Sequence, residues 1–92
     1  MTNGNTQKSN NKTNSWIHAL STAEASSGEF ILSTFNASDI AEYQVAIRST
    51  AGAPRAITQI LPGSGTVDIK ATSLSAGDIA FVQGIWYVDS NI

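Results

Sequence analysis

The sequence predicts a small, mainly β protein: an antiparallel β-sandwich or barrel of about six strands, with an extended polar N-terminal arm and at most one short helix. Three observations predict this fold class. The chain has 92 residues, which is enough for one domain with a small core. Turn-forming residues recur roughly every 8–12 residues, a spacing typical of sandwiches and barrels. Between these turns, apolar and polar side chains alternate as they do along half-buried strands.

The first 15 residues differ in composition from the rest of the chain. They read MTNGNTQKSNNKTNS, and after Met1 none of them is apolar. Such a segment cannot by itself bury enough apolar surface to offset the entropy lost on ordering. We therefore expect a polar arm at residues 1–15, flexible or ordered on a partner, and a single β domain at residues 16–92.

Residues 15–27 form the one candidate helix, with Ser15 at the N-cap position. The apolar residues of this segment follow the helical spacing i, i+3, i+4, i+7, namely Trp16, Ala19, Leu20 and Ala23. The segment is also rich in serine, which is a weak helix former. A strand over residues 16–20 is therefore the alternative.

The chain from Gly28 onward is predicted to be β. The clearest half-buried strand covers residues 43–47, where Tyr43, Val45 and Ile47 alternate with polar or small residues. Further strands are predicted at 30–35, 55–61, 66–71, 79–82 and 85–88. Turns are predicted at 36–39, 51–54 and 62–65, and a loop at 72–78.

The segment 77–88, GDIAFVQGIWYV, is predicted to be a tight hairpin that turns at Gln83-Gly84. In this hairpin one face carries Ile79, Phe81, Ile85 and Tyr87, and the other carries Trp86 and Val88. If the Phe81 ring lies in the core, Phe81→Ala should cost about 3–5 kcal/mol, whereas a cost under ~1 kcal/mol would mean that the ring faces outward. Because both faces are apolar, we expect both to be covered, the second one by another chain.

The low charge of the chain favours a protein that works by assembly. Charged residues make up 13% of the sequence, about half of the ~25% that is usual. Neutral β surfaces lose little solvation energy when they pack on one another, and few charges are present to block pairing of strand edges. The residues expected at an inter-subunit interface are Trp16, Trp86, Tyr87, Val88 and Ile92.

The Asn/Ser/Thr-rich arm, the cysteine-free β body and the closing hairpin at 77–88 together resemble the small β-rich structural proteins of tailed-bacteriophage virions. These include capsid decoration (cement) proteins, head-fibre bases and tail components. The hairpin is similar to the Gly-Asp … Gly-x-Trp-Tyr ending of phage fibre and spike modules. The resemblance implies a virion protein that forms a homo-oligomer, a trimer being favoured, and that binds other virion proteins. It implies no catalytic or ligand-binding residue.

Composition excludes several other function classes. The chain has no Cys and one His, so we expect no disulfide, no metal site and no cofactor. Its net charge of −2 argues against nucleic-acid binding, and no apolar run is long enough to span a membrane. Gly63-Ser64-Gly65-Thr66 lacks the lysine of a phosphate-binding loop and is interpreted as a hairpin turn. We expect no small-molecule ligand.

Two alternatives to a structural role remain. A carbohydrate- or receptor-binding module would stack its ligand on aromatic rings supplied by Trp16, Tyr43, Trp86 and Tyr87. A small hydrolase, the third choice, would use Asp78, Asp89 or His18. We expect no enzyme, because no nucleophile and base stand at a recognisable spacing, and because Asp39, Asp78 and Asp89 lie beside turns, where aspartate commonly bonds to the backbone.

Overall fold

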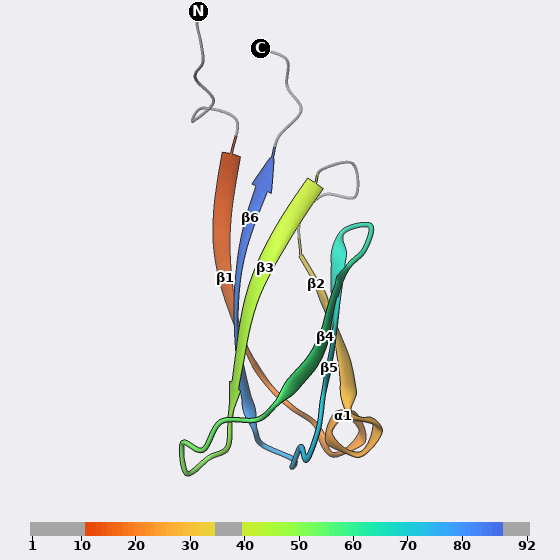
Figure 1. Cartoon of the computed structure of the whole chain (residues 1–92), viewed down its shortest axis with the longest axis vertical. Helices are drawn as coiled ribbons and strands as arrows, with labels where there is room; N and C mark the ends of the chain where they lie inside the picture. Colours follow the sequence, from red (N-terminus) through yellow and green to blue (C-terminus); the bar gives the residue numbers. More distant parts are fainter. Residues whose placement is uncertain (1–10, 35–39, 88–92) are drawn as a thin grey trace, which may run out of the picture.

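The computed structural model of the chain describes residues 11–34 and 40–87. It confirms the predicted fold class, since six strands and one short helix form two antiparallel sheets (Figure 1). The predicted turn at 36–39 and the interface candidates Val88 and Ile92 lie outside the described residues. In the part of the chain that is described, no helix is long and apolar enough to cross a membrane.

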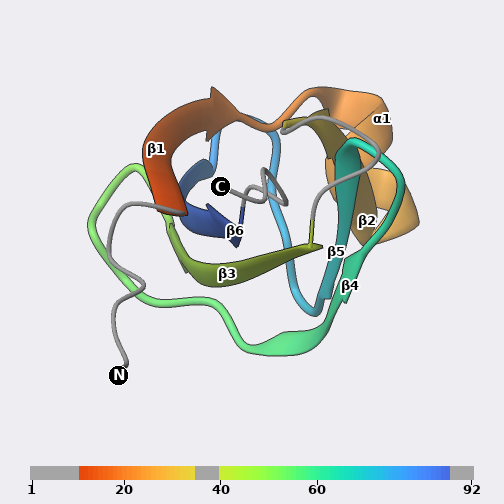
Figure 2. The same cartoon turned by 90° about the horizontal axis from the view of Figure 1, so that it is seen from above.

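Each sheet contains three strands, and the two sheets face one another across the core (Figure 2). Sheet A has the strand order β1 (Asn11–Ala19), β6 (Ile79–Tyr87), β3 (Ile40–Arg48). Sheet B has the order β2 (Glu29–Ser33), β5 (Thr66–Ala71), β4 (Ile57–Pro62), and the helix α1 (Thr22–Ser27) connects β1 to β2. In each sheet the middle strand comes later in the chain than both of the edge strands that it joins.

The core lies between the sheets and is built from alternate residues of the strands. Along β3, for example, Tyr43 and Ile47 are buried while Gln44, Ala46 and Arg48 are exposed. The buried apolar residues are Leu20, Phe30, Tyr43, Ile47, Val67, Ile69, Ala71, Ala80 and Val82. Near the end of β2, the hydroxyls of Thr34 and Tyr43 share a hydrogen bond that links the two sheets.

The predicted helix at 15–27 is wrong in its first half, where the alternative strand is right. The strand β1 runs from Asn11 to Ala19, so five residues of the expected arm belong to sheet A. The helix begins only after Ser21, because a capping box forms there: the Ser21 Oγ accepts the Glu24 N–H at 3.1 Å, and a Glu24 carboxylate oxygen accepts the Ser21 N–H at 2.8 Å. It ends at Gly28, whose φ of 75° is the left-handed conformation of a helix C-cap.

The predicted hairpin at 77–88 is also wrong. The strand β6 runs without a break through Gln83 and Gly84 and pairs on both sides, so that Gly84 stands between Asn14 of β1 and Tyr43 of β3. Gly84 is buried. A glycine inside a strand commonly marks a close approach of other groups, and the rings of Tyr43 and Trp16 occupy the adjacent inward positions of β3 and β1 with centroids 6.3 Å apart.

The continuous strand reverses the predicted placement of Phe81. The residues Ile79, Phe81, Ile85 and Tyr87 do share one face of β6, but it is the outer face, and Phe81 is 44% exposed. The neighbouring Val82 occupies the core and is 1% exposed. Reading the strand as a hairpin therefore assigned the large side chains to the wrong side of the sheet.

A buried ion pair joins three chain segments at the end of the sandwich nearest α1. Asp78 is 1% exposed, and its carboxylate accepts hydrogen bonds from Arg55 Nε at 2.8 Å, Arg55 Nη2 at 3.2 Å and the Ser75 N–H at 2.9 Å. The Asp78 carbonyl accepts the Leu20 N–H at 2.8 Å, and the Arg55 N–H bonds to the Ile47 carbonyl at 2.8 Å. The Arg55 guanidinium, followed by the Ser75 N–H, holds the pKa of Asp78 below its ordinary value of 3.8.

Truncating Ile69 and Phe81 should have very different effects on stability. Ile69 is fully buried, so Ile69→Ala should lower the free energy of unfolding by about 2–5 kcal/mol. Phe81 points outward, so Phe81→Ala should cost about 1 kcal/mol or less. Urea denaturation at low protein concentration measures both values. A larger cost for Phe81→Ala than for Ile69→Ala would show that β6 is out of register.

Asp78→Asn should lower the Tm at pH 7 by on the order of 10 °C, because the partly buried guanidinium of Arg55 loses its opposite charge. The native pKa of Asp78 is depressed, so its carboxylate contributes stability above the ordinary pKa of 3.8 that is lost as the pH falls through the native pKa. The Tm of the wild type should therefore fall below about pH 4 more steeply than that of the variant. Thermal unfolding followed by circular dichroism from pH 7 to pH 2 tests this, and parallel curves would contradict it.

Candidate interaction surface

The outer face of sheet A is the surface that points away from sheet B. The strand register places its residues in rows across the three strands, with β6 in the middle. From β1 it carries Thr13, Ser15, Ile17 and Ala19; from β6, Ile79, Phe81, Gln83, Ile85 and Tyr87; and from β3, Ile40, Glu42, Gln44, Ala46 and Arg48. These side chains face outward because the alternate residues of the same strands form the core.

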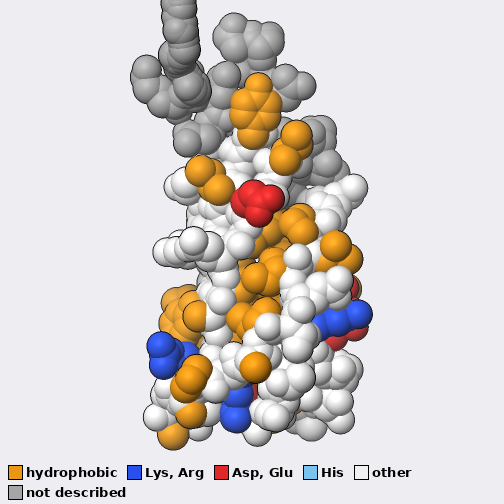
Figure 3. Space-filling view, in the orientation of Figure 1, with side chains coloured by type: hydrophobic (Ala, Val, Ile, Leu, Met, Phe, Trp, Pro, Cys, Tyr) orange, Lys and Arg blue, Asp and Glu red, His pale blue; other side chains and the backbone are white. Residues whose placement is uncertain are grey.

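Large apolar side chains are exposed in two groups on this face. Tyr87 pairs with Ile40 at one end, and next to them lies Ile85; the exposed fractions are 47%, 73% and 46%. At the other end Ile17, 73% exposed, pairs with Phe81. Figure 3, which looks at the molecule from the side of β3 and β4, shows several groups of hydrophobic side chains separated by uncharged atoms and few charged side chains. Large apolar side chains exposed close together on one face are a feature of protein–protein contact surfaces.

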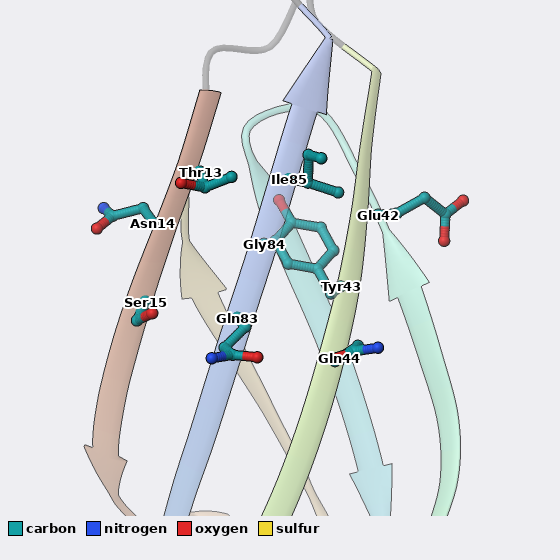
Figure 4. A pocket seen from close by; sticks show the side chains of 9 residues that line it. All are labelled: Thr13, Asn14, Ser15, Glu42, Tyr43, Gln44, Gln83, Gly84 and Ile85. Atoms are coloured by element: carbon teal, nitrogen blue, oxygen red, sulfur yellow. The ribbon is translucent and has the colours of Figure 1, made fainter. Parts of the chain in front are cut away.

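An uncharged polar belt crosses the face between the two apolar groups. It consists of Ser15, Gln83 and Gln44, which stand in one row of the sheet. On the side of Ile85 and Thr13 the belt borders a shallow groove of about 650 Å³ (Figure 4), and on the side of Phe81 and Ile17 a second groove of about 500 Å³. The side chains of this belt can both donate and accept hydrogen bonds, so a partner surface with the same groups can satisfy them.

The sequence-predicted interface residues are divided between two faces. Trp16 and Trp86 are half-buried on the inner side of sheet A, packed against the core, whereas Tyr87 lies on the outer face. The exposed residues Ile17, Ile40, Phe81 and Ile85 were missed as surface residues. Periodicity could not have found Phe81 and Ile85, because both faces of β6 are apolar; the outward position of all four residues follows from the pairing of β6 with β1 and β3.

The four aromatic residues considered for a sugar-stacking platform do not share one surface. Tyr43 is buried, its ring lies 6.3 Å from that of Trp16, and Trp86 also packs against the core. Only Tyr87 of the four is largely exposed. Trp16, Tyr43 and Trp86 are therefore arranged as core side chains, and Tyr87 stands apart from them.

His18 is held in a structural contact at the corner between β1 and α1. Its Nε2 lies 2.9 Å and 3.1 Å from the two carboxylate oxygens of Glu24, and its ring stacks on Phe30 with centroids 5.3 Å apart. Glu24 also closes the capping box, and its pKa is lowered first by the Ser21 N–H and then by His18. The Asp78 carboxylate is engaged by Arg55 and Ser75, and Asp89 lies outside the described residues.

Two carboxyl groups meet on the outer face of sheet B. A hydrogen bond to the Asp68 side chain, together with desolvation and the negative charge of Asp68, raises the pKa of Glu29 above 4.5 against the opposing effect of Lys70. One carboxylate oxygen of Asp68, Oδ1, is buried and has no hydrogen-bond partner among the described residues. No group of three or more His, Asp or Glu residues that could hold a metal ion occurs within residues 11–34 and 40–87.

Searches against protein-family models, curated proteins and solved structures found no match to this chain. The assignment of a function therefore depends on the sequence and on the surfaces described above.

Glu29→Gln should raise the Tm at pH 7 by a few degrees. In the folded protein the pKa of Glu29 is raised, so its contribution to stability is greatest below pH 4.5 and is lost as the pH rises through the native pKa. A neutral amide removes the repulsion with Asp68 and can donate a hydrogen bond to it. Thermal unfolding of this variant beside Glu42→Gln, which changes an exposed glutamate of sheet A, measures the effect. An equal or lower Tm for Glu29→Gln at pH 7 would contradict it.

Proposed function

We propose that this protein is a structural protein of a virion and acts by assembly, with the outer face of sheet A as its main contact surface. The observation that carries the proposal is the exposure of Ile17, Ile40, Phe81, Ile85 and Tyr87, each 44–73% exposed, on one sheet face. Burial of apolar surface is worth about 25 cal/mol per Å², so covering these side chains is the largest stabilisation that this surface can gain from a partner.

The charge distribution supports protein as the partner. Among the outer-face residues only Glu42 and Arg48 carry a charge, and they lie on the edge strand β3. The centre of the face is apolar or uncharged, and this resembles the core of a protein–protein interface, where charged residues are depleted. A nucleic-acid partner would need a basic surface in the same place.

The virion assignment is supported by the resemblance to decoration, fibre-base and tail proteins in the polar N-terminal segment, the cysteine-free β body and the low charge. It implies contacts with other virion proteins and a homo-oligomer, with a trimer favoured. Stabilisation of a shell or attachment of a fibre would then follow from neutral β surfaces that pack on one another.

Phe81→Lys should prevent assembly through the outer face of sheet A, because burying an ammonium group in the interface costs solvation free energy. The matched control is Ile31→Lys, which places the same charge on the outer face of sheet B, where Ile31 is 59% exposed. Sedimentation velocity over a range of concentrations should show higher oligomers for the wild type and the control, and only smaller species for Phe81→Lys. A wild type that stays monomeric at every concentration, or an equal loss in both variants, would contradict the proposal.

A further inference from the structure

The four edge strands of the sandwich differ in their protection against pairing with another chain. An edge strand exposes a row of unpaired N–H and C=O groups unless it is short, bulged, interrupted by proline or covered. In sheet B, β2 has five residues, and β4 has a register shift between Ile57 and Gln59 and ends in Pro62. In sheet A, the segment that follows β3 covers part of its edge, through the Arg55 N–H to Ile47 and a bridge between Arg48 and Pro54.

The strand β1 has none of these protections. It is nine residues long, contains neither proline nor glycine, and keeps one register with β6 from Asn11 to Ala19. It is the edge of sheet A, and within the described residues no strand lies on its other side (Figure 1). Lys12 is its only acidic or basic residue apart from His18.

Two hydrogen bonds establish which backbone groups of β1 point to the free edge. Leu20 donates to the Asp78 carbonyl at 2.8 Å and accepts from the Gly77 N–H at 2.9 Å, so the even-numbered residues of β1 face β6. The bond from the Arg55 N–H to the Ile47 carbonyl agrees, because Ile47 pairs with Ala80 and turns its carbonyl away from β6. The N–H and C=O groups of Asn11, Thr13, Ser15, Ile17 and Ala19 therefore point outward from the edge.

We propose that β1 pairs antiparallel with β1 of a second copy of this chain about a twofold axis at Ser15, which joins the two copies of sheet A into one six-stranded sheet. In this register Ser15 pairs with its own counterpart, Thr13 with Ile17, and Asn11 with Ala19. In this register the backbone N–H and C=O groups of all five outward-pointing residues of each strand lie opposite the other strand. The contact is made by backbone atoms, so it is independent of the outer-face contact proposed above.

Charge and area both favour a second copy as the occupant. The register brings Lys12 of one chain opposite His18 of the other, whose ring contacts the Glu24 carboxylate, so the ammonium group lies on the side of the sheet that carries this negative charge. From the strand spacings, the outer face of one sheet A measures about 14 × 30 Å, or ~400 Å² in projection. A standard interface buries about 800 Å² on each partner. Two joined copies of sheet A would present one continuous outer face of about 800 Å², the size of one side of a standard interface.

Cysteine cross-linking tests the register directly, because the chain contains no cysteine of its own. In the proposed pair the two Ser15 Cα atoms would lie about 5.5 Å apart, within the range of a disulfide. The two Thr13 Cα atoms would lie ~14 Å apart, which a disulfide cannot span. Under mild oxidation of the full chain, Ser15→Cys should form a covalent dimer at least about ten times faster than Thr13→Cys. The double variant Thr13→Cys/Ile17→Cys should cross-link as Ser15→Cys does.

A charge test complements cross-linking. Ser15→Lys places two ammonium groups opposite each other on the axis, whereas Ser15→Thr preserves the strand without adding charge. Both changes are made in the Phe81→Lys protein, in which the outer-face contact is already removed; there Ser15→Lys should reduce the dimer fraction in sedimentation velocity about tenfold and Ser15→Thr should not change it. Equal cross-linking at residues 13 and 15, absence of cross-linking at both, or equal sedimentation of the two Ser15 variants would overturn the pairing. Phe81→Lys should leave cross-linking at Ser15 intact, so failure of the outer-face proposal and failure of the edge pairing give different results.

Discussion

The ion pair between Arg55 and the buried Asp78 is the interaction on which the arrangement of the two sheets depends. Neither residue belongs to a strand, yet between them they tie the end of β1, the β3–β4 connection and the loop before β6 to one another. A charged carboxylate at 1% exposure is costly unless each of its lone pairs is used. Here two guanidinium nitrogens and one backbone N–H donate three hydrogen bonds to the two carboxylate oxygens, which fixes the position of Arg55 relative to the loop before β6. Because Leu20 bonds to the Asp78 backbone, the same residue also determines which groups of β1 face β6.

The chemistry of the two outer faces divides the molecule into unlike sides. Sheet B presents Glu29, Asp68 and Lys70 close together, with the exposed side chains of Ile31 and Leu61 on either side of Asp68, so its centre carries charge. Sheet A presents aliphatic and aromatic side chains with an amide and hydroxyl belt. The two outer faces therefore differ in charge, which lets a partner distinguish one side of the molecule from the other. That property suits a protein that occupies a defined position in a larger particle.

Much of the fold could be predicted from the sequence, and the errors have physical causes. Strands with clear alternation, such as β3 and β5, and the Pro62–Gly65 turn were placed correctly, because one of their faces is apolar and the other polar. The helix was extended too far because Trp16 and Leu20 fit a helical spacing as well as a strand, while the capping box at Ser21 and Glu24 marks its true start. Strand β6 was divided because Gly84 resembles a turn residue, although in this sheet it provides space beside aromatic rings. With both faces of β6 apolar, periodicity alone could not tell core from surface. The residues of the outer face can be identified only from the pairing of β6 with β1 and β3.

The strand order of sheet A has a consequence for how the chain reaches its native state. No two strands of this sheet are consecutive in the sequence, since β1, β3 and β6 are separated by all the strands of sheet B. Sheet B, by contrast, contains the local hairpin of β4 and β5, which can form early across a short loop. The strands β1 and β3 cannot pair until β6 has left the ribosome and inserted between them. During synthesis these two strands remain open to competing contacts, and folding of this half of the molecule is expected to be slow and to start from the β4–β5 hairpin.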